Sequence, residues 1–306
     1  MARLPKIAAA LAAVALLLSG CGKGRVDVPD DLDDFDFGTD YVSTVPSDGF
    51  KLMSFNVRYE NSSDNSSGHG WAKRREGVYE MLRTQRPLVM GVQECLYSQR
   101  YDIFSNVPEY EVIGVGRDDG KEKGEIMAIF YQKDSVSIVD WGTFWLSDTP
   151  DKVSKGWDAA CFRTCTWARF HHKRLNKDFL YLNTHLDHKG TVAREQSVKL
   201  IVQKIGELNT SSLPCFLSAD FNSTEDNQIF DPLKLLMKSA RKTAPVSDSY
   251  ATFNGFESSV KGSGSIIDHI FFSGNTQVTE YKTVRDSWKN IDYISDHYPI
   301  YAIFTL

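Results

Sequence analysis

Acidic and imidazole side chains stand next to each other twice near the C-terminus, as Asp268-His269 and as Asp296-His297. Farther upstream, polar side chains follow short apolar, strand-like runs of the chain. These side chains are Asn56, Glu94, His185, Asp220 and Asn222. Carboxylates, amides and histidines delivered at strand ends are what a phosphoryl-transfer site with a hard metal ion requires.

In this order the motifs resemble those of the endonuclease/exonuclease/phosphatase superfamily, the fold of pancreatic deoxyribonuclease. The resemblance spans roughly Gly49 to Leu306 and rests on six short motifs. Each motif is weak evidence alone, but the six together in this order are specific for the family. The six are Phe55-Asn56-Val57, Gln93-Glu94, Asn183-Thr184-His185-Leu186, Asp220-Phe221-Asn222, Asp268-His269 and Ser295-Asp296-His297. The chain departs from the family pattern at Ala219, where Gly is usual, and at Ile126, where Asn is frequent. Neither departure removes a catalytic group.

The resemblance implies that a metal ion, Mg²⁺ or Mn²⁺, takes part in the reaction. It implies Glu94 as the principal ligand, with Asn56 and Asp296 beside the ion. A surface glutamate and a turn-forming asparagine are the plainer interpretations. A carboxylate that ends the apolar run Leu88–Val92 is nevertheless costly unless it is paired or metal-bound, which favours the metal site.

The resemblance assigns catalytic roles to two pairs of histidine and carboxylate. His185 would donate to a phosphate oxygen, with Glu125 orienting its ring. His297 would lie nearest the scissile phosphate, with Asp268 bonded to its other ring nitrogen. Two satisfied polar loops are the alternative for the second pair.

Asp220 and Asn222 are alternate residues of a stretch expected to be extended, so both side chains should face one side. By resemblance, Asp220 would orient the attacking water and Asn222 would donate to a phosphate oxygen. The alternative is that both are loop residues capping a helix that starts near Glu225.

The substrate is less well defined by the sequence. Arg117 and Arg163 are candidate phosphate clamps because guanidinium binds phosphate through two parallel hydrogen bonds, although exposed ion pairs would use the same residues. Trp157 could stack on a sugar or a base, or could simply pack. A net charge of −5 with scattered Lys and Arg argues against a duplex-binding face. We therefore expect a small-molecule, sugar or lipid phosphoester, monoester or diester, with nucleic acid left open.

The first residues are typical of an export signal. Arg3 and Lys6 precede the apolar run Ile7–Leu18, which is too short to be read as a membrane span. Ser19-Gly20-Cys21 completes a pattern that resembles a bacterial lipobox. We expect residues 1–20 to be a lipoprotein signal peptide and Cys21 to carry lipid, which would place the protein in a bacterial cell envelope outside the cytoplasm. An ordinary signal peptide is the alternative.

Residues 21–48 are expected to form an acidic flexible tether. Eight aspartates and few large aliphatic residues occur between Gly22 and Asp48, so the segment buries too little to offset its ordering entropy. Docking of Phe35, Phe37 and Tyr41 on the domain is the alternative.

The elements that must position these residues are read from hydrophobic periodicity. Strand-like runs occur at 50–56, 88–93, 110–115, 126–132, 136–141, 165–171, 178–184, 214–219, 266–272, 276–283 and 299–305. Helical patterns cover Trp71–Gln85 and Thr191–Leu208. Because several strands follow one another without a helix, a simple alternating parallel fold is excluded. We predict an α/β (α+β) fold for residues 49–306, a four-layer sandwich of two mixed β-sheets packed face to face with helices outside, and a monomer.

Cys95, Cys161, Cys165 and Cys215 show no paired spacing typical of zinc, and free thiols are expected. Ser295-Asp296-His297 is no serine-hydrolase triad, because no nucleophile elbow accompanies it.

The predicted function is an exported, lipid-anchored, metal-dependent phosphoesterase that uses in-line attack by water. A nuclease of the same superfamily and a non-catalytic surface binding lipoprotein are the alternatives.

Overall fold

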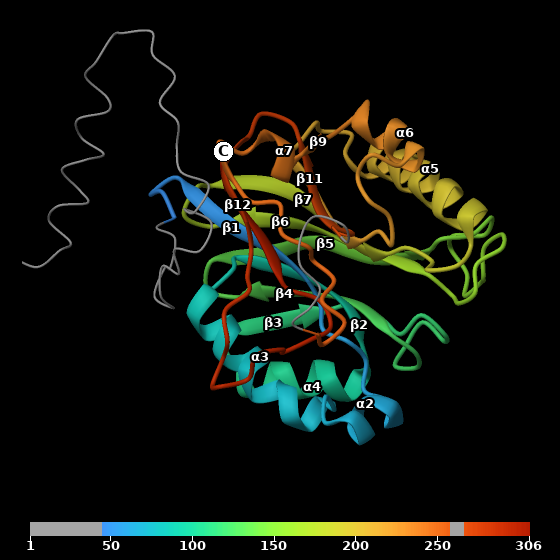
Figure 1. Ribbon diagram of the computed structural model, residues 1–306. Helices are drawn as coiled ribbons and strands as arrows, with labels where there is room; N and C mark the ends of the chain where they lie inside the picture. Colours follow the sequence, from blue (N-terminus) through green and yellow to red (C-terminus); the bar gives the residue numbers. More distant parts are fainter. Residues whose placement is uncertain (1–44, 258–265) are drawn as a thin grey trace, which may run out of the picture. The chain divides into compact units, whose positions relative to one another are not determined.

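A computed structural model describes residues 45–257 and 266–306 and contains two β-sheets with helices on their outer faces (Figure 1). The seven-stranded sheet has the order β10 (Val246–Ser247), β12 (Gln277–Thr283), β13 (Ile300–Thr305), β1 (Gly49–Asn56), β2 (Val89–Cys95), β4 (Ile126–Gln132) and β3 (Tyr110–Ile113). The six-stranded sheet has the order β5 (Val136–Trp145), β6 (Thr164–His172), β7 (Lys177–His185), β8 (Cys215–Asp220), β11 (Asp268–Ser273) and β9 (Lys238–Ser239). Both sheets mix parallel and antiparallel pairs.

The helices are α2 (Ser62–Ser67), α3 (Trp71–Gln85), α4 (Tyr97–Asn106), α5 (Thr191–Leu208), α6 (Asp231–Lys234) and α7 (Ala240–Thr243), with a short 3₁₀ turn at Gln228–Phe230. The two longest, α3 and α5, have the predicted bounds. None of the helices in the part of the chain described here is long and apolar enough to cross a membrane. The predicted signal peptide, Cys21 and the tether up to residue 44 lie outside the described residues.

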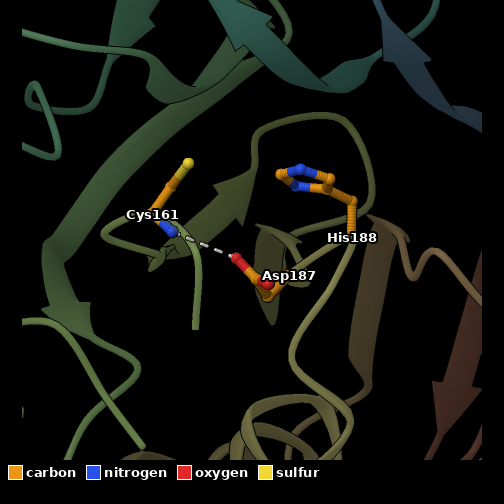
Figure 2. A group of neighbouring side chains, drawn as sticks. All are labelled: Cys161, Asp187 and His188. Carbon is orange, nitrogen blue, oxygen red and sulfur yellow. Dashed lines mark hydrogen bonds between the residues drawn. The ribbon is translucent and has the colours of Figure 1, made fainter. Parts of the chain in front are cut away.

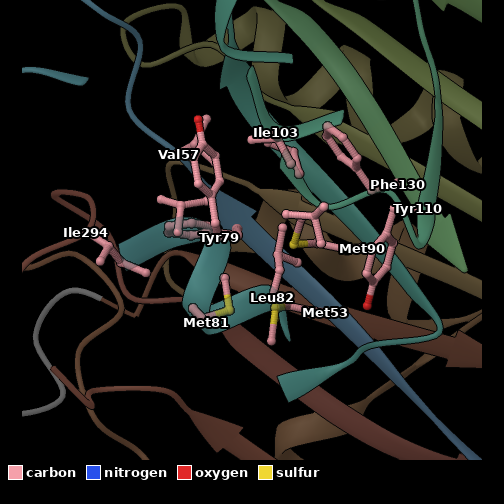
Figure 3. Close-up of a cluster of buried hydrophobic side chains, with 14 of the residues drawn as sticks. Met53, Val57, Tyr79, Met81, Leu82, Met90, Ile103, Tyr110, Phe130 and Ile294 are labelled. Carbon is pink, nitrogen blue, oxygen red and sulfur yellow. The ribbon is translucent and has the colours of Figure 1, made fainter. Parts of the chain in front are cut away.

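Three buried clusters separate the layers. The central cluster fills the space between the sheets and is rich in aromatic rings from both, including Phe50, Phe179, Phe216 and Phe304. A second cluster packs α3 and α4 against the seven-stranded sheet (Figure 3). A third packs α5 against the six-stranded sheet. This layering of helix, sheet, sheet and helix confirms the predicted four-layer sandwich.

Strand β1 shows how alternation directs side chains to the site. Met53, Phe55 and Val57 enter the cluster beneath α3. The intervening residues face the other sheet, because successive side chains of a strand point to opposite sides. Along that inner face the strand changes from apolar Leu52 to polar Asn56, and Asn56 reaches Asp220 of β8 with an Nδ2–Oδ2 distance of 3.0 Å.

A hydrogen-bonded polar layer separates the aromatic core from the site. Asn183 of β7 donates to the carbonyls of Val92 and Ala128 in the opposite sheet and accepts from Gln93. Gly91 lies where the sheets approach closely, and a Cβ there would collide with the side chains of Ser218 and Asn183. Asn183 is therefore a residue that ties the two sheets together, which keeps their strand ends in a fixed relation.

Candidate active site

A cavity of about 570 Å³ opens at the edge where polar strand ends from both sheets meet. Parallel strands β1, β2, β7 and β8 end at this edge, and antiparallel strands β4, β11 and β13 begin there. The predicted site residues that line the cavity are Glu94, Arg117, Glu125, Arg163, His185, Asp220, Asn222, Asp296 and His297. Asn56 and Asp268 lie directly behind this wall, bonded to Asp220 and His297 respectively.

Asp268 and His297 form a buried ion pair. Nδ1 of His297 is 2.8 Å from Oδ2 of Asp268, and Nε2 is 3.7 Å from Oδ2 of Asp220. Burial alone would lower the pKa of His297, but the charges of Asp268 and Asp220 outweigh it and raise the pKa to about 10. The ring is therefore an imidazolium at neutral pH, with one N–H committed to Asp268 and the other facing the carboxylate of Asp220.

Asp220 lies at the centre of the constellation. In the strand register, Asp220 of β8 lies opposite Asp268 of β11 on one side and opposite His185 of β7 on the other. Its carboxylate accepts from Asn56 and from the backbone N–H of Asn222. Burial and the nearby charge of Asp268 raise the pKa of Asp220 to about 7, although His297 opposes the shift. A carboxylate with a pKa near neutrality suits a general base.

Asn222 differs from the sequence expectation. β8 ends at Asp220, and Asn222 has a φ of 49°, so the chain turns instead of continuing extended. Its Nδ2 donates to the Leu186 carbonyl at 2.9 Å and lies 3.0 Å from Nε2 of His185. Nε2 of His185 thus lies between the amide of Asn222 and Oδ2 of Asp220, which is 3.4 Å away. In this arrangement Asn222 positions His185.

His185 and Glu125 lie near each other without a hydrogen bond. Nδ1 of His185 is 3.8 Å from Oε2 of Glu125, whose closer partner is Arg117 at 2.6 Å. Burial, reinforced by Arg163 and Arg117, holds the pKa of His185 well below its usual range. Burial also raises the pKa of Glu125 to about 7. The ring of His185 is thus neutral, and the predicted orienting contact from Glu125 stays a prediction.

Glu94 reaches the cavity because β2 is irregular there. The pairing of β2 with β4 shifts register between Val92 and Cys95, and Glu94 has a φ of 56°. Such a bulge re-aims a side chain at the end of a strand. Glu94 accepts from Nδ2 of Asn56 at 3.1 Å and from the backbone of Tyr59.

The acidic side of the cavity has a donor set that fits a hard divalent ion. Burial raises the pKa of Asp296, and the neighbouring charge of Glu94 adds to the shift, so a cation between these carboxylates would relieve both effects. In this arrangement the nitrogen of Asn56, not its oxygen, faces Glu94 and Asp220. Glu94 and Asp296 are therefore the carboxylates on this side that could hold such an ion, and all three ligand assignments, Asn56 included, stay predictions.

Two arginines that sequence reasoning passed over support this side. Arg58 contacts Asp296 at 3.3 Å and Asp64 at 2.8 Å, and it lines the cavity. Arg74 is buried and donates to the carbonyls of Val57, Arg58, His69 and Ile294. It thereby joins the loop after β1 to the loop that carries Asp296. Arg58 could have been found from the sequence, because it directly follows the motif Phe55-Asn56-Val57.

Cys161, Asp187 and His188 form another group of potential metal ligands, and Cys161 and His188 of this group line the cavity. Figure 2 shows that the backbone of Cys161, not its thiol, is turned toward Asp187. Arg163 contacts both Asp187, at 3.3 Å, and His188, at 3.0 Å. A fixed guanidinium makes this group unsuitable for a cation.

The predicted substrate-binding residues differ in whether they line the cavity. Arg163 and Arg117 both lie on the cavity wall. Trp157 is not part of the cavity lining, and its indole N–H donates to Asp148 at 3.1 Å. Stacking of Trp157 on a substrate stays a prediction. Cys95, Cys161, Cys165 and Cys215 are free thiols.

Comparison with known proteins gives one family. Residues 53–297 match the model of the endonuclease/exonuclease/phosphatase family. The mannosyl-6-phosphatase of Bacteroides thetaiotaomicron VPI-5482 is 37% identical, with 84% of this chain and 100% of that chain covered and a TM-score of 0.81. A family protein from Bacteroides vulgatus is 36% identical, with coverage of 84% and 99% and a TM-score of 0.79. The D. rerio TDP2 complexed with a single-strand DNA product is 15% identical, with coverage of 84% and 99% and a TM-score of 0.68, which shows a shared fold.

Proposed function

The chain belongs to the endonuclease/exonuclease/phosphatase family, and from that premise we propose that it hydrolyses a phosphomonoester of a small polar molecule such as a sugar phosphate. The observation that carries this proposal is the cavity in which Asp220, imidazolium His297 and the acidic pair of Glu94 and Asp296 face one space. A base, an acid and a cation-binding pair around one space are the parts that attack of water on phosphorus requires.

In the proposed reaction, Asp220 accepts a proton from the attacking water. His297 donates its Nε2–H to a phosphate oxygen as negative charge develops, and Asp268 holds the ring in place. Such preorganised donors stabilise the transition state because they need no reorientation during the reaction. Neutral His185, positioned by Asn222, adds a polar wall beside Asp220.

Glu94 and Asp296 would hold a divalent metal ion, with Mg²⁺ or Mn²⁺ proposed from the oxygen donors. Such an ion supplies charge neutralisation at the phosphate oxygens when it is bound. Arg58 would then hold the outer side of Asp296 in place.

Two observations support a small substrate. A volume of about 570 Å³ falls within the range of pockets that enclose small ligands. The relative from Bacteroides thetaiotaomicron is named as a mannosyl-6-phosphatase and is matched over its whole length. The net charge of −5 does not favour a long anionic polymer.

Phosphate release from a panel of phosphoesters with Mg²⁺ or Mn²⁺ tests the proposal. We expect mannose 6-phosphate and other monoesters to be hydrolysed, and bis(p-nitrophenyl) phosphate and single-stranded DNA to be poor substrates. Glu94→Gln should lose a metal-binding site in calorimetry and most of the activity, whereas the exposed control Asp151→Asn should retain both. Hydrolysis of DNA in preference to every monoester would replace this proposal with a nuclease function, and no hydrolysis at all would favour a binding protein.

We also propose export and lipid anchoring at the envelope, which Leu18-Ser19-Gly20-Cys21 supports. Mass spectrometry of the protein from a bacterial envelope should find an N-terminal Cys21 that carries acyl chains. A Cys21→Ser variant should appear unprocessed or unlipidated. An unmodified cysteine, or cleavage at another position, would contradict the anchor without affecting the proposed chemistry.

A further inference from the structure

The wall that carries His188 differs from the floor of the cavity. Asp220 and His297 are only 1% and 5% exposed, whereas His188 is an exposed residue that lines the same space. The phosphate must reach the buried floor to meet the catalytic groups. A side chain on the exposed wall is therefore placed to contact the part of the substrate that extends outward from the phosphate.

Asp187 anchors this wall. Its Oδ1 accepts from the backbone of Lys189 at 3.0 Å and of Gly190 at 2.8 Å, and its Oδ2 accepts from Cys161 N and Arg163 Nε. Burial would raise the pKa of Asp187, but these backbone hydrogen bonds and the charge of Arg163 hold it well below its usual range. The carboxylate is ionised at every physiological pH and fixes Arg163.

Arg163 in turn determines which nitrogen of His188 carries the proton. A guanidinium has only N–H donors, and its Nη2 lies 3.0 Å from Nδ1 of His188. Nδ1 must therefore accept, which leaves the proton of the neutral ring on Nε2. Desolvation and the charge of Arg163 both lower the pKa of His188 and keep the ring neutral. The result is one neutral N–H donor of fixed orientation on the cavity wall.

We propose that His188 is a substrate-binding residue that donates its Nε2–H to a hydroxyl or ring oxygen of the leaving group, with Asp187 and Arg163 as its positioning residues. This inference rests on the proposed phosphomonoesterase function and extends it to recognition of a polyhydroxylated leaving group. The aromatic residues Tyr59 and Phe253 line the same cavity. Aromatic side chains for C–H surfaces and a neutral donor for oxygens together suit a sugar.

The test compares two monoesters that share the phosphate and differ in the leaving group. Mannose 6-phosphate offers hydroxyl acceptors, and phenyl phosphate offers none. His188→Leu should lower kcat/KM for mannose 6-phosphate about tenfold, the usual value of one neutral hydrogen bond, and should leave phenyl phosphate nearly unchanged. His188→Gln, which retains an N–H donor, should recover part of the loss. His171→Leu, at a histidine that does not line the cavity, is the matched control.

¹⁵N NMR of the wild-type imidazole should show a neutral ring protonated at Nε2. A ring protonated at Nδ1, an equal loss on both substrates, or equal values for the Leu and Gln variants would each overturn the role of His188 while leaving the phosphatase function intact. Wild-type hydrolysis of phenyl phosphate but not of mannose 6-phosphate would also overturn it. If the wild type hydrolyses neither ester, the proposed function itself fails, and this inference fails with it.

Discussion

Replacing Asp220 with asparagine should lower kcat about 10³-fold or more, toward the upper part of the range for a positioned general base. The amide has nearly the same shape and can still accept from the backbone of Asn222, but it cannot take a proton from water. Because the loss is expected in the chemical step, KM should change much less than kcat. Steady-state kinetics on mannose 6-phosphate, with folding checked by circular dichroism, measures both.

Ser218→Ala provides a matched control on the same strand. Ser218 is buried two residues before Asp220 and bonds Tyr181 in the polar layer between the sheets, away from the reacting groups. We expect this variant to lose some stability and little activity. A folded Asp220→Asn enzyme with more than a tenth of wild-type kcat would contradict the role of Asp220 as the base.

The strand framework was predictable because its signals are local. Apolar, strand-like runs gave most of the longer strands, and the helical patterns gave α3 and α5 with their observed bounds. Helix α4 was missed because it buries few side chains, chiefly Gln99 and Ile103, and therefore carries little periodicity. The two-residue strands β9 and β10 are too short to show any period.

The members of the candidate site were predictable for a related reason. Each polar residue follows or precedes a strand, and the mixed sheets bring those ends to one edge, so motif and topology agree. His185, Asp220 and Asp268 even occupy one row across three neighbouring strands.

Contacts that depend on loop geometry were not predictable. The turn at Asn222 directs its amide to His185, and the loop that contains Trp157 directs the indole to Asp148. The contact between Arg163 and His188 joins residues 25 positions apart, and no periodic pattern in the sequence predicts it. Side-chain partners across loops follow from the folded backbone, whereas strand ends follow from the sequence pattern.

Asp268 and His297 should act in catalysis as one unit. Asp268→Asn and His297→Ala should each lower kcat by about 10²-fold or more, the scale of a positioned acid or base. The double variant should be little slower than either single variant, since Asp268 acts only through the ring that it holds at 2.8 Å. The measurement is kcat for the three variants on mannose 6-phosphate with saturating metal ion.

The pH profile distinguishes this coupling from a purely structural effect. Asp268 and Asp220 raise the pKa of His297 to about 10, so the wild-type ring keeps its proton until the pH approaches that value. Loss of the Asp268 charge lowers the pKa, and the alkaline limb of kcat should therefore move toward neutral pH in Asp268→Asn. Since His297→Ala has no ring to titrate, its profile should lack that limb. Multiplicative losses in the double variant, or an unmoved alkaline limb in Asp268→Asn, would show that the two residues act independently.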